Sequence, residues 1–402
     1  MSVSKRVWRI IATLAVVSLI AAGCGDDDDG GGGDEAGGGD GGGEGSIWVL
    51  LPDTASSDRW EKDDRRFFAE AFEAAGLSEG DDFTIVNAEG DANTQQSQAE
   101  QAISDGASVI VLTSLDTGSG ATIIDQAKEA DVQVVEYDRF NTGGSGGAAY
   151  VSFDNVAVGA AMAEAVEPAI DELGVTPARV VMLNGGEEDN NSFLFKQGYE
   201  ETVNERADAG DWEVVADQFV PGWDNAEAQT LMEQILVDNN NDVDAVFAAN
   251  DGLANSVINA LEGAGVGPVP LSGQDATQAG IQNVLLGKQT VSVYKPIQDE
   301  AGVAAAIALA LRSGDDLEEA AESYESELPS GGSSVELTGI EAESGEPSDE
   351  TEGEGIVPYV ALVPIGVTVD NVADTVIADE FRTVEELCTG DVASTEFCQQ
   401  NS

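Results

Sequence analysis

The sequence contains no histidine, and this absence excludes several kinds of chemistry. Histidine is the commonest general base near neutral pH and the commonest protein ligand of transition metals. Without it, a Ser-His or Cys-His catalytic pair cannot form. The chain also has no phosphate-binding loop, no nucleophile elbow and no metal-binding motif. We therefore expect no catalytic residues, no cofactor and no metal.

Basic residues are scarce. The chain has 16 Lys and Arg against 77 Asp and Glu, and its formal net charge is −61. So negative a surface excludes nucleic acid as a partner and argues against binding to anionic lipid surfaces, because like charges repel. Two low-complexity segments, 25–45 and 336–354, carry eight acids each. Most of the negative charge therefore lies on the folded part of the chain.

Cysteines are also few. Two of the three, Cys388 and Cys398, lie ten positions apart near the C-terminus. In an exported protein such a pair predicts a disulfide that holds the chain terminus in place. Two free thiols are the alternative.

The N-terminal segment has the pattern of an export signal. A basic start precedes an apolar run, Ile10–Ala22, which is shorter than the roughly 20 residues that span a bilayer. The run leads into Gly-Cys and resembles a bacterial lipobox, whose cysteine carries a lipid. We expect residues 1–23 to be a lipoprotein signal peptide, Cys24 to be lipidated, and 24–45 to form an acidic, glycine-rich tether. The protein would then be exported and anchored to the outer face of the cytoplasmic membrane. A plain signal peptide with an incidental cysteine is the alternative.

From Ser46 onward, short apolar runs alternate with helical patterns. This rhythm predicts parallel sheets covered by helices on both faces. The length of the folded part favours two hydrophobic cores rather than one. We therefore predict an α/β fold of two doubly wound units, the second starting near Tyr150. The predicted strands are Ile47–Leu51, Phe83–Asn87, Ser108–Leu112, Gln133–Tyr137, Tyr150–Phe153, Ala178–Leu183, Trp212–Gln218, Ala245–Ala248, Pro270–Gly273, Thr290–Tyr294 and Pro358–Pro364.

Polar side chains follow many of these strands. Ligands of open α/β sheets bind at the carboxyl ends of the strands, so these loops form the expected site. Asp and Asn accept protons from hydroxyl groups, Arg and Lys donate to them, and an indole can pack on the face of a sugar ring. The set therefore suits a neutral polyol. The loops contain Asp58-Arg59-Trp60, Asp138-Arg139, Asp189-Asn190-Asn191, Gly222-Trp223, Asn250-Asp251, Gln274-Asp275 and Lys295.

Single loops also have structural interpretations. Asp138 and Arg139 could form a surface ion pair. Asn250 before a predicted helix is typical of an N-cap. Trp60 could be an ordinary core residue.

Several longer motifs occur in a characteristic order. Tyr137-Asp138-Arg139 and Gly273-Gln274-Asp275-Ala276 are the more general ones, and Arg59-Trp60-Glu61-Lys62-Asp63, Asp189-Asn190-Asn191 and Tyr294-Lys295-Pro296-Ile297 are more particular. Together they resemble the type I periplasmic sugar-binding proteins of ABC importers, and most of all their D-xylose-binding members. The resemblance extends from Ile47 to Phe381.

The resemblance implies a two-lobed clamp with three crossing segments and a sugar in the cleft. The N-terminal lobe would comprise 46–150 plus about 296–340, and the C-terminal lobe 151–295 plus about 357–402. An acidic low-complexity insertion would occupy 336–356. By position, the ligand-binding residues would be Arg59, Trp60, Asp138, Arg139, Asn191, Trp223, Asn250, Asp275 and Lys295, with Asp189 and Asn190 as secondary candidates.

The expected function follows from the resemblance. A monomer would bind a monosaccharide by closure of its cleft and would deliver it to an ABC permease and its ATPase. D-xylose is the favoured ligand, and another sugar such as ribose or galactose is the alternative ligand. Presentation of the sugar to a receptor and a surface glycosidase are the alternatives. The mixed Asn, Arg and Trp loops are not what a glycosidase needs, so we expect no enzymatic activity.

Lipidation can be tested directly. Cells that express the wild type and are fed a labelled fatty acid should incorporate label into the protein. If the segment is a lipobox, the thiol of Cys24 is the group that accepts the lipid. The Cys24→Ser variant should incorporate none. Equal labelling of both forms would contradict a lipid on Cys24.

Overall fold

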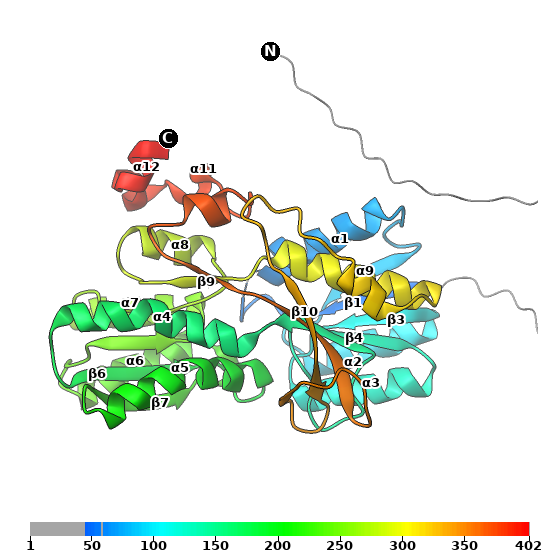
Figure 1. Ribbon diagram of the computed structural model, residues 1–402, viewed down its shortest axis with the longest axis horizontal. Helices are drawn as coiled ribbons and strands as arrows, with labels where there is room; N and C mark the ends of the chain where they lie inside the picture. The colour runs from blue at the N-terminus through cyan, green and yellow to red at the C-terminus, as the bar shows by residue number, and fades with distance from the viewer. Residues whose placement is uncertain (1–44, 58, 402) are drawn as a thin grey trace, which may run out of the picture. The chain divides into compact units, whose positions relative to one another are not determined.

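The structure is a computed structural model that describes residues 45–57 and 59–401 (Figure 1). Cys24, the expected signal peptide and almost all of the expected tether lie outside these residues. Strands and helices alternate along most of the described chain. No helix in this part is long and apolar enough to cross a membrane.

The larger of the sheets has eight strands in the order β11-β10-β12-β5-β4-β3-β1-β2. The six strands from β12 to β2 are parallel, whereas β10 and β11 extend one edge in antiparallel pairing. The strands are β1 (Ser46–Leu51), β2 (Phe83–Asn87), β3 (Ala107–Leu112), β4 (Gln133–Tyr137), β5 (Ala149–Phe153), β10 (Val335–Glu341), β11 (Pro347–Ser348) and β12 (Ile356–Leu362).

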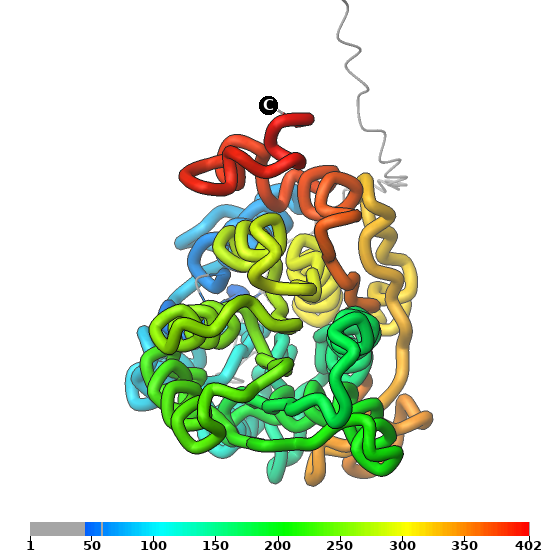
Figure 2. The backbone as a smooth tube through the Cα atoms, turned by 90° about the vertical axis from the view of Figure 1, so that its left-hand side faces the viewer, coloured from blue at the N-terminus to red at the C-terminus, as the bar shows by residue number. Residues whose placement is uncertain are grey.

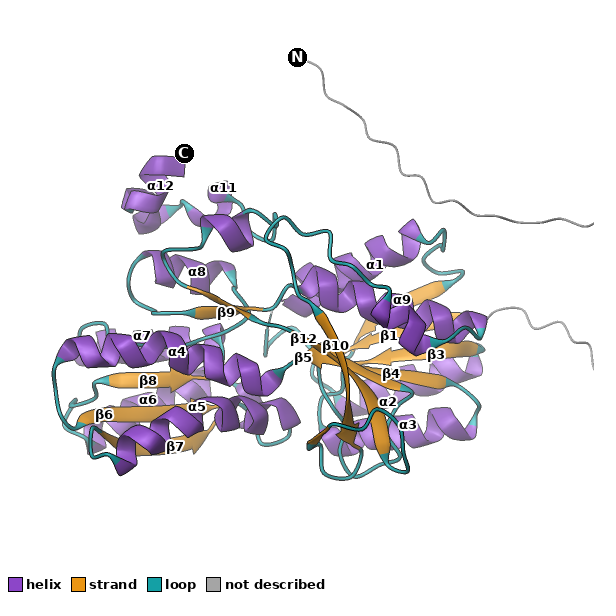
Figure 3. Ribbon diagram, viewed as in Figure 1, coloured by secondary structure: helices purple, strands orange, loops and turns teal. Residues whose placement is uncertain are grey.

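Successive side chains of this sheet enter two different hydrophobic layers. Val49 of β1 belongs to the layer that contains Phe68, whereas its neighbour Leu50 belongs to the layer that contains Ile123. This alternation is the period of two that a strand imposes. Helices α1 (Arg65–Ala74) and α9 (Ile297–Ser313) supply the first layer, and α2 (Ala92–Ser104) and α3 (Thr117–Glu129) supply the second (Figure 3). The predicted doubly wound α/β architecture is confirmed.

The second lobe is built on a smaller sheet. The parallel strands β6 (Ala178–Asn184), β7 (Trp212–Phe219) and β8 (Ala245–Ala248) lie in the order β7-β6-β8. A separate antiparallel pair is formed by β9 (Ser292–Tyr294) and β13 (Ile365–Val367). The helices of this lobe are α4 (Asn155–Leu173), α5 (Asn190–Asp208), α6 (Asn225–Asp238), α7 (Asp251–Ala264) and α8 (Gln278–Leu285).

Three connections cross between the lobes. They lead from β5 into α4, from β9 into α9 and from β12 into β13. The polar loops of both sheets therefore meet where the lobes face each other.

Two expectations about the strands are wrong. The strand at Tyr150–Phe153 pairs with β4 and β12, so it belongs to the first sheet and does not open the second unit at 151. Pro270–Gly273 makes only an isolated bridge, at Leu271. An apolar run has the same pattern in either sheet, and its pairing depends on distant residues that the local pattern does not show.

The acidic segment 336–356 is also more ordered than expected. β10 pairs with β12 from Val335 opposite Leu362 to Glu341 opposite Ile356. Ile340 is completely buried, while Glu336 and Glu341 are exposed. These two acids therefore stand at exposed positions near the two ends of a real strand. The number of acids in the segment conceals this strand in the sequence.

The C-terminal segment packs on α8 (Figure 2). Cys388 and Cys398 form a disulfide there, and they enclose the turn between α11 (Val384–Leu387) and α12 (Glu396–Asn401). The side-chain amide of Gln282 donates to the carbonyl oxygen of Leu387 over 3.0 Å. The end of the chain is thereby fixed to the second lobe.

Helices α4 and α5 approach each other through glycine. A Cβ atom at Gly198 would lie 2.1 Å from the carbonyl oxygen of Val156, and one at Gly159 would lie 2.0 Å from that of Phe195. We expect Gly198→Ala to lower the free energy of unfolding by about 2 kcal/mol, because the backbone must move apart. Denaturant unfolding measures this change. In the control Gly263→Ala, the added Cβ meets nothing within 4 Å, so stability should stay equal or rise by up to about 1 kcal/mol. Equal stability of Gly198→Ala and wild type would contradict the close packing.

Candidate functional site

Ten of the eleven predicted ligand-binding residues line one cavity between the lobes. The loops after β1 and β4 supply Arg59, Trp60, Asp138 and Arg139, and the other residues come from the second lobe and the β9 crossing. Asn190 is the exception, because its side-chain amide points to the carbonyl oxygen of Gly345 at 3.5 Å. The cavity is lined by Arg59, Trp60, Asp138, Arg139, Asp189, Asn191, Trp223, Asn250, Asp275 and Lys295, together with Ser56, Ser57, Phe195 and Gln274.

Arg59 is the most connected residue of the cavity. It lies just before the short π-helix η1 (Trp60–Asp64) and is 2% exposed. Its guanidinium donates to Asp64 over 2.7 and 2.9 Å, to Asp138 over 2.9 Å and to Glu300 over 3.0 Å. Tyr137 also donates to Asp64, over 2.7 Å. Arg59 therefore joins η1, the loop after β4 and helix α9 in one buried network.

Two further ion pairs connect the lobes. The ammonium of Lys295 lies 3.3 Å from Asp138 and 3.4 Å from Asp275. The guanidinium of Arg139 lies 3.2 Å from Asp189. The interpretation of Asp138 and Arg139 as a surface ion pair is therefore wrong, since both are buried and each binds a partner elsewhere.

Asn191 adds a neutral connection across the cleft. Its amide donates to the carbonyl oxygen of Asp138 over 2.8 Å, and its own carbonyl accepts from Asn155 over 3.0 Å. Asp138 comes from the loop after β4 in the first lobe, and Asn191 from the first turn of α5 in the second. Their contact is therefore made only when the lobes lie as close as they do in this structure.

One tryptophan from each lobe borders the cavity. The guanidinium of Arg59 stacks 4.2 Å from the centre of the Trp60 ring, and that of Arg139 lies 5.5 Å from it. Trp60 donates to Ser56 over 3.3 Å, whereas the buried indole N–H of Trp223 has no partner among the described residues. Trp60 is 3% exposed and so combines a core position with a place in the cavity wall.

Backbone strain gathers at the same place. Asp138, Trp223 and Asp275 have φ angles of 60°, 55° and 89°, in the left-handed region that side chains other than glycine rarely occupy. Such conformations cost about 1–3 kcal/mol each and persist only where the surroundings impose them. Their concentration in one cavity wall indicates a site that is shaped at the expense of local stability.

Four cavity residues were absent from the predicted set of ligand-binding residues. Gln274 was named only as part of the strand-end loop that it shares with Asp275. Ser56 and Ser57 belong to the loop after β1, and the strand-end rule could have included them. Phe195 lies one helical turn beyond Asn191 inside α5. No local pattern separates it from a core residue.

The match to known families agrees with this geometry. Residues 48–316 match the family model described as periplasmic binding protein domain. The chain belongs to the periplasmic binding protein family. It has the type I fold of that family, with two α/β lobes and a mostly parallel sheet.

Two relatives and one solved structure show the range of similarity. The D-xylose-binding periplasmic protein of Escherichia coli (strain K12) is 33% identical over 338 residues, which cover 83% of this chain and 90% of that protein. The multiple sugar-binding periplasmic protein SbpA of Azospirillum brasilense is 30% identical over 64% of this chain and 74% of its own length. A solute binding protein of an ABC transporter from Clostridium phytofermentans, solved with bound β-D-glucose, has a TM-score of 0.71 at 24% identity, and covers 85% of this chain and 99% of that one.

Polar residues in the cavity of this periplasmic binding protein also serve the helices behind them. Asn250 accepts from the amide of Leu253 over 2.8 Å and is the N-cap of α7, as one interpretation of the sequence held. It lines the cavity as well. Asp189 caps α5 through the amide of Asn191 and also pairs with Arg139. Capping and lining are therefore compatible roles.

Charge in the cavity is balanced by its own residues. Burial opposes ionisation of Asp138, but Lys295, Arg59 and Arg139 together lower its pKa to about 2. Burial and the nearby Asp138 raise the pKa of Glu300, although Arg59 and Lys295 oppose the shift. One carboxyl oxygen of Glu300 has no partner within the described chain. No group of three or more acids and cysteines in residues 45–57 and 59–401 is arranged to hold a metal ion.

Buried carboxyls should give this periplasmic binding protein an unusual pH dependence. Burial raises the pKa of Glu136 and of Asp251 to about 7, from 4.5 and 3.8. Between about pH 4 and 7 the folded form then holds more protons than the unfolded form, so stability falls as pH rises. We expect a higher free energy of unfolding at pH 5 than at pH 8 in urea.

High salt and two variants distinguish the effect of these buried carboxyls on stability from that of repulsion between exposed acids. Experiments at high ionic strength screen the repulsion between exposed acids. Glu136→Gln and Asp251→Asn should each flatten the slope of stability against pH, whatever their effect on stability itself. A stability that rises from pH 5 to pH 8 would contradict the expected protonation.

Proposed function

We propose that this periplasmic binding protein captures a monosaccharide, D-xylose, and delivers it to an ABC permease. The observation that carries the proposal is the cavity between the lobes, in which carboxylates, amides and cations face one another between Trp60 and Trp223. Sugar hydroxyls both donate and accept, so they can use both kinds of group. The relatives that are 33% identical and named D-xylose-binding periplasmic proteins support the choice of sugar.

The pairing of charges supports a neutral ligand. Arg59, Arg139 and Lys295 each bind at least one carboxylate inside the cavity. An anionic solute would have to displace those carboxylates, and leaving buried charges unpaired is strongly unfavourable. A neutral polyol can instead bind to the outer lone pairs and protons of groups that are already oriented.

Cleft closure is the proposed mode of capture. Asn191 bonds to the main chain of Asp138 across the cleft, and Lys295 bridges Asp138 and Asp275. A ligand shifts the equilibrium between open and closed forms only through contacts that it gains on closure. Sugar held between the two lobes would gain such contacts and would lose its surrounding water.

Delivery would follow from the closed form. The permease would bind the closed lobes, and a lipid on Cys24 would keep the protein close to the membrane and raise its effective concentration there. The protein would act as a monomer without enzymatic activity. A glycosidase needs one protonated and one free carboxylate on either side of the bond to be cleaved, whereas Asp138 and Asp275 both bind Lys295.

Calorimetric titration tests the proposed ligand. The wild type should bind D-xylose more tightly than D-ribose, D-galactose or D-glucose. Asp275→Ala should weaken binding by about 2 kcal/mol, because it leaves buried donors without an acceptor. Asp275→Asn should also weaken it, and this variant keeps a side chain that tolerates the left-handed backbone.

A surface aspartate provides the control. Asp242 is 70% exposed and pairs with Arg179 away from the cavity, so Asp242→Ala should bind the sugar like the wild type. Unchanged affinity of the Asp275 variants would remove Asp275 from the site. Absence of binding to every monosaccharide tested would overturn the proposed function.

A further inference from the structure

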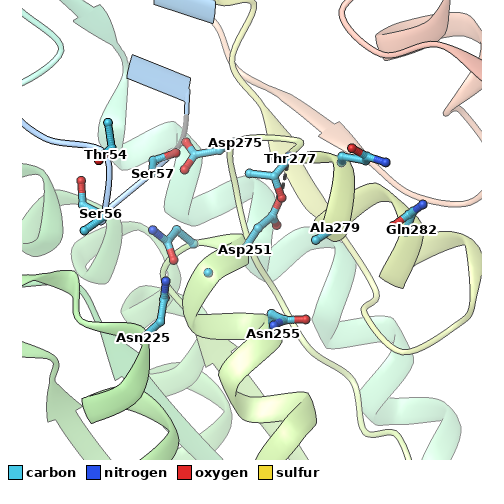
Figure 4. Close-up of a pocket in the computed structure, with 14 residues that line it drawn as sticks. Thr54, Ser56, Ser57, Asn225, Asp251, Asn255, Asp275, Thr277, Ala279 and Gln282 are labelled. Atoms are coloured by element: carbon cyan, nitrogen blue, oxygen red, sulfur yellow. Dashed lines mark hydrogen bonds between the residues drawn. The ribbon is translucent and has the colours of Figure 1, made fainter. Parts of the chain in front are cut away.

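Asp251 is a buried carboxylate just behind the cavity wall. It is the first residue of α7 and is 1% exposed. One oxygen accepts from the backbone N–H and the hydroxyl of Thr277 over 2.9 and 3.0 Å, as Figure 4 shows for this pair. The other accepts from the amide of Gln289 and the hydroxyl of Ser292, both over 2.8 Å. Asp251 thus collects donors from two segments that are distant from it in the sequence, one at Thr277 and one at 289–292.

Each of these segments carries or adjoins a cavity residue. Thr277 comes two positions after Asp275, and Ser292 begins the strand that ends just before Lys295. Asn250 is the residue before Asp251 itself. The backbone N–H of Asp251 also donates to the carbonyl oxygen of Gln274 over 3.0 Å. One side chain and its own backbone therefore connect every cavity-lining loop of the second lobe that follows β8.

The segment held in this way belongs to no helix or strand, although the N–H of Asp275 donates to the carbonyl oxygen of Val293 over 2.9 Å and Arg382 donates to that of Ala276 over 3.0 Å. Asp275 and Ala276 both have positive φ angles, 89° and 45°. They lie between an isolated bridge at Gln274 and the start of α8, so no regular helix or strand includes them. The N–H of Ala276 donates to the hydroxyl of Ser292, which in turn donates to Asp251. Asp251 is therefore the final acceptor of this chain of hydrogen bonds.

The surrounding chain leaves Asp251 little freedom to move. A Cβ atom at Gly280 would lie 1.9 Å from one carboxylate oxygen, and one at Gly273 would lie 2.5 Å from the other. Glycine at these two positions lets the backbone close around the carboxylate. The position of Asp251 is therefore fixed by packing as well as by hydrogen bonds.

We propose that Asp251 is a positioning residue, which sets Asn250, Asp275 and Lys295 in their places before the sugar arrives. It does not touch the sugar and acts through these three residues. A site that is ordered in advance loses less entropy on binding and so binds more tightly. The proposal rests on the proposed sugar-binding function, but the ordering of the loop does not require any sugar and can be measured without it.

The experiment compares the full chain with Asp251→Asn in two measurements. Amide hydrogen exchange of the sugar-free protein should become about tenfold or more faster in residues 273–280, because their acceptor is weakened. Affinity for D-xylose should fall by about tenfold or more. Ser292→Ala removes one donor to Asp251 and the acceptor of the Ala276 N–H. It leaves the carboxylate and its other donors in place, so it should show the same effects to a smaller degree.

Asp299→Asn is the matched control. Asp299 is also 1% exposed and accepts from the N–H of Ser333 and the hydroxyl of Tyr324, but it lines no part of the cavity. Its replacement should leave exchange in 273–280 and affinity for D-xylose within about twofold of the wild type.

A double-mutant cycle separates positioning from general destabilisation. If Asp251 acts through Asp275, Asp251→Asn should weaken D-xylose binding less than about threefold once Asp275 is already Ala. An equal fold-loss in both backgrounds would overturn the proposal, as would unchanged exchange in residues 273–280, or faster exchange with unchanged affinity. A wild type that binds no monosaccharide would overturn the proposed function instead, and the exchange result would still decide whether Asp251 orders the loop.

Discussion

The site depends on one buried guanidinium. Arg59 binds Asp64 from its own helix, Asp138 from the loop after β4 and Glu300 from α9. Transfer of these charges out of water costs several kcal/mol per ion, and the cost is offset only when geometry and hydrogen bonding are nearly ideal. The network therefore requires that η1, β4 and α9 keep their relative positions. Trp60, stacked on Arg59, and Lys295, bound to Asp138, take their places from the same constraint.

Much of the fold and of the site followed from local patterns in the sequence. Apolar runs separated by helices predicted parallel sheets, and the rule that ligands bind at strand ends selected loops such as Asp138-Arg139 and Gln274-Asp275. The failures concern long-range pairing. The residues of β5 do not show which sheet they join, and the acids of β10 conceal a strand that only β12 explains. Asn190 differs from Asn191 by one position on α5, so only the helix geometry decides which of them faces the cavity.

Capping a helix and lining the cavity, which the sequence offered as alternative roles, are performed by the same residues. A polar residue between a strand and a helix can cap the helix with one acceptor and still present another group to the cleft. Asn250 and Asp189 do this in the second lobe. The consequence is mechanical, because the cap ties each of these cavity-lining residues to a helix of its own lobe. Residues that line the cavity are thereby also among those most firmly joined to the scaffold.

In the proposed closure of the cleft, the charge of the chain would set the balance between open and closed lobes. The buried cations Arg59, Arg139 and Lys295 are accompanied by buried carboxyls such as Asp64, Asp138 and Asp189, so the large excess of acids over bases in the composition lies mainly on the outer surface. Acidic lobes repel each other, and this repulsion favours the open form, most strongly at low ionic strength. Inside the cleft the sign is reversed, since Arg139 of the first lobe attracts Asp189 and Lys295 of the second lobe attracts Asp138. These attractions act over a few ångströms and the repulsion over a Debye length of about 8 Å at physiological salt. In the proposed closure, repulsion between the acidic surfaces therefore opposes the approach of the lobes at long range, and the ion pairs in the cleft favour it at short range. A ligand held between the lobes would act at the separation where the attraction begins to exceed the repulsion.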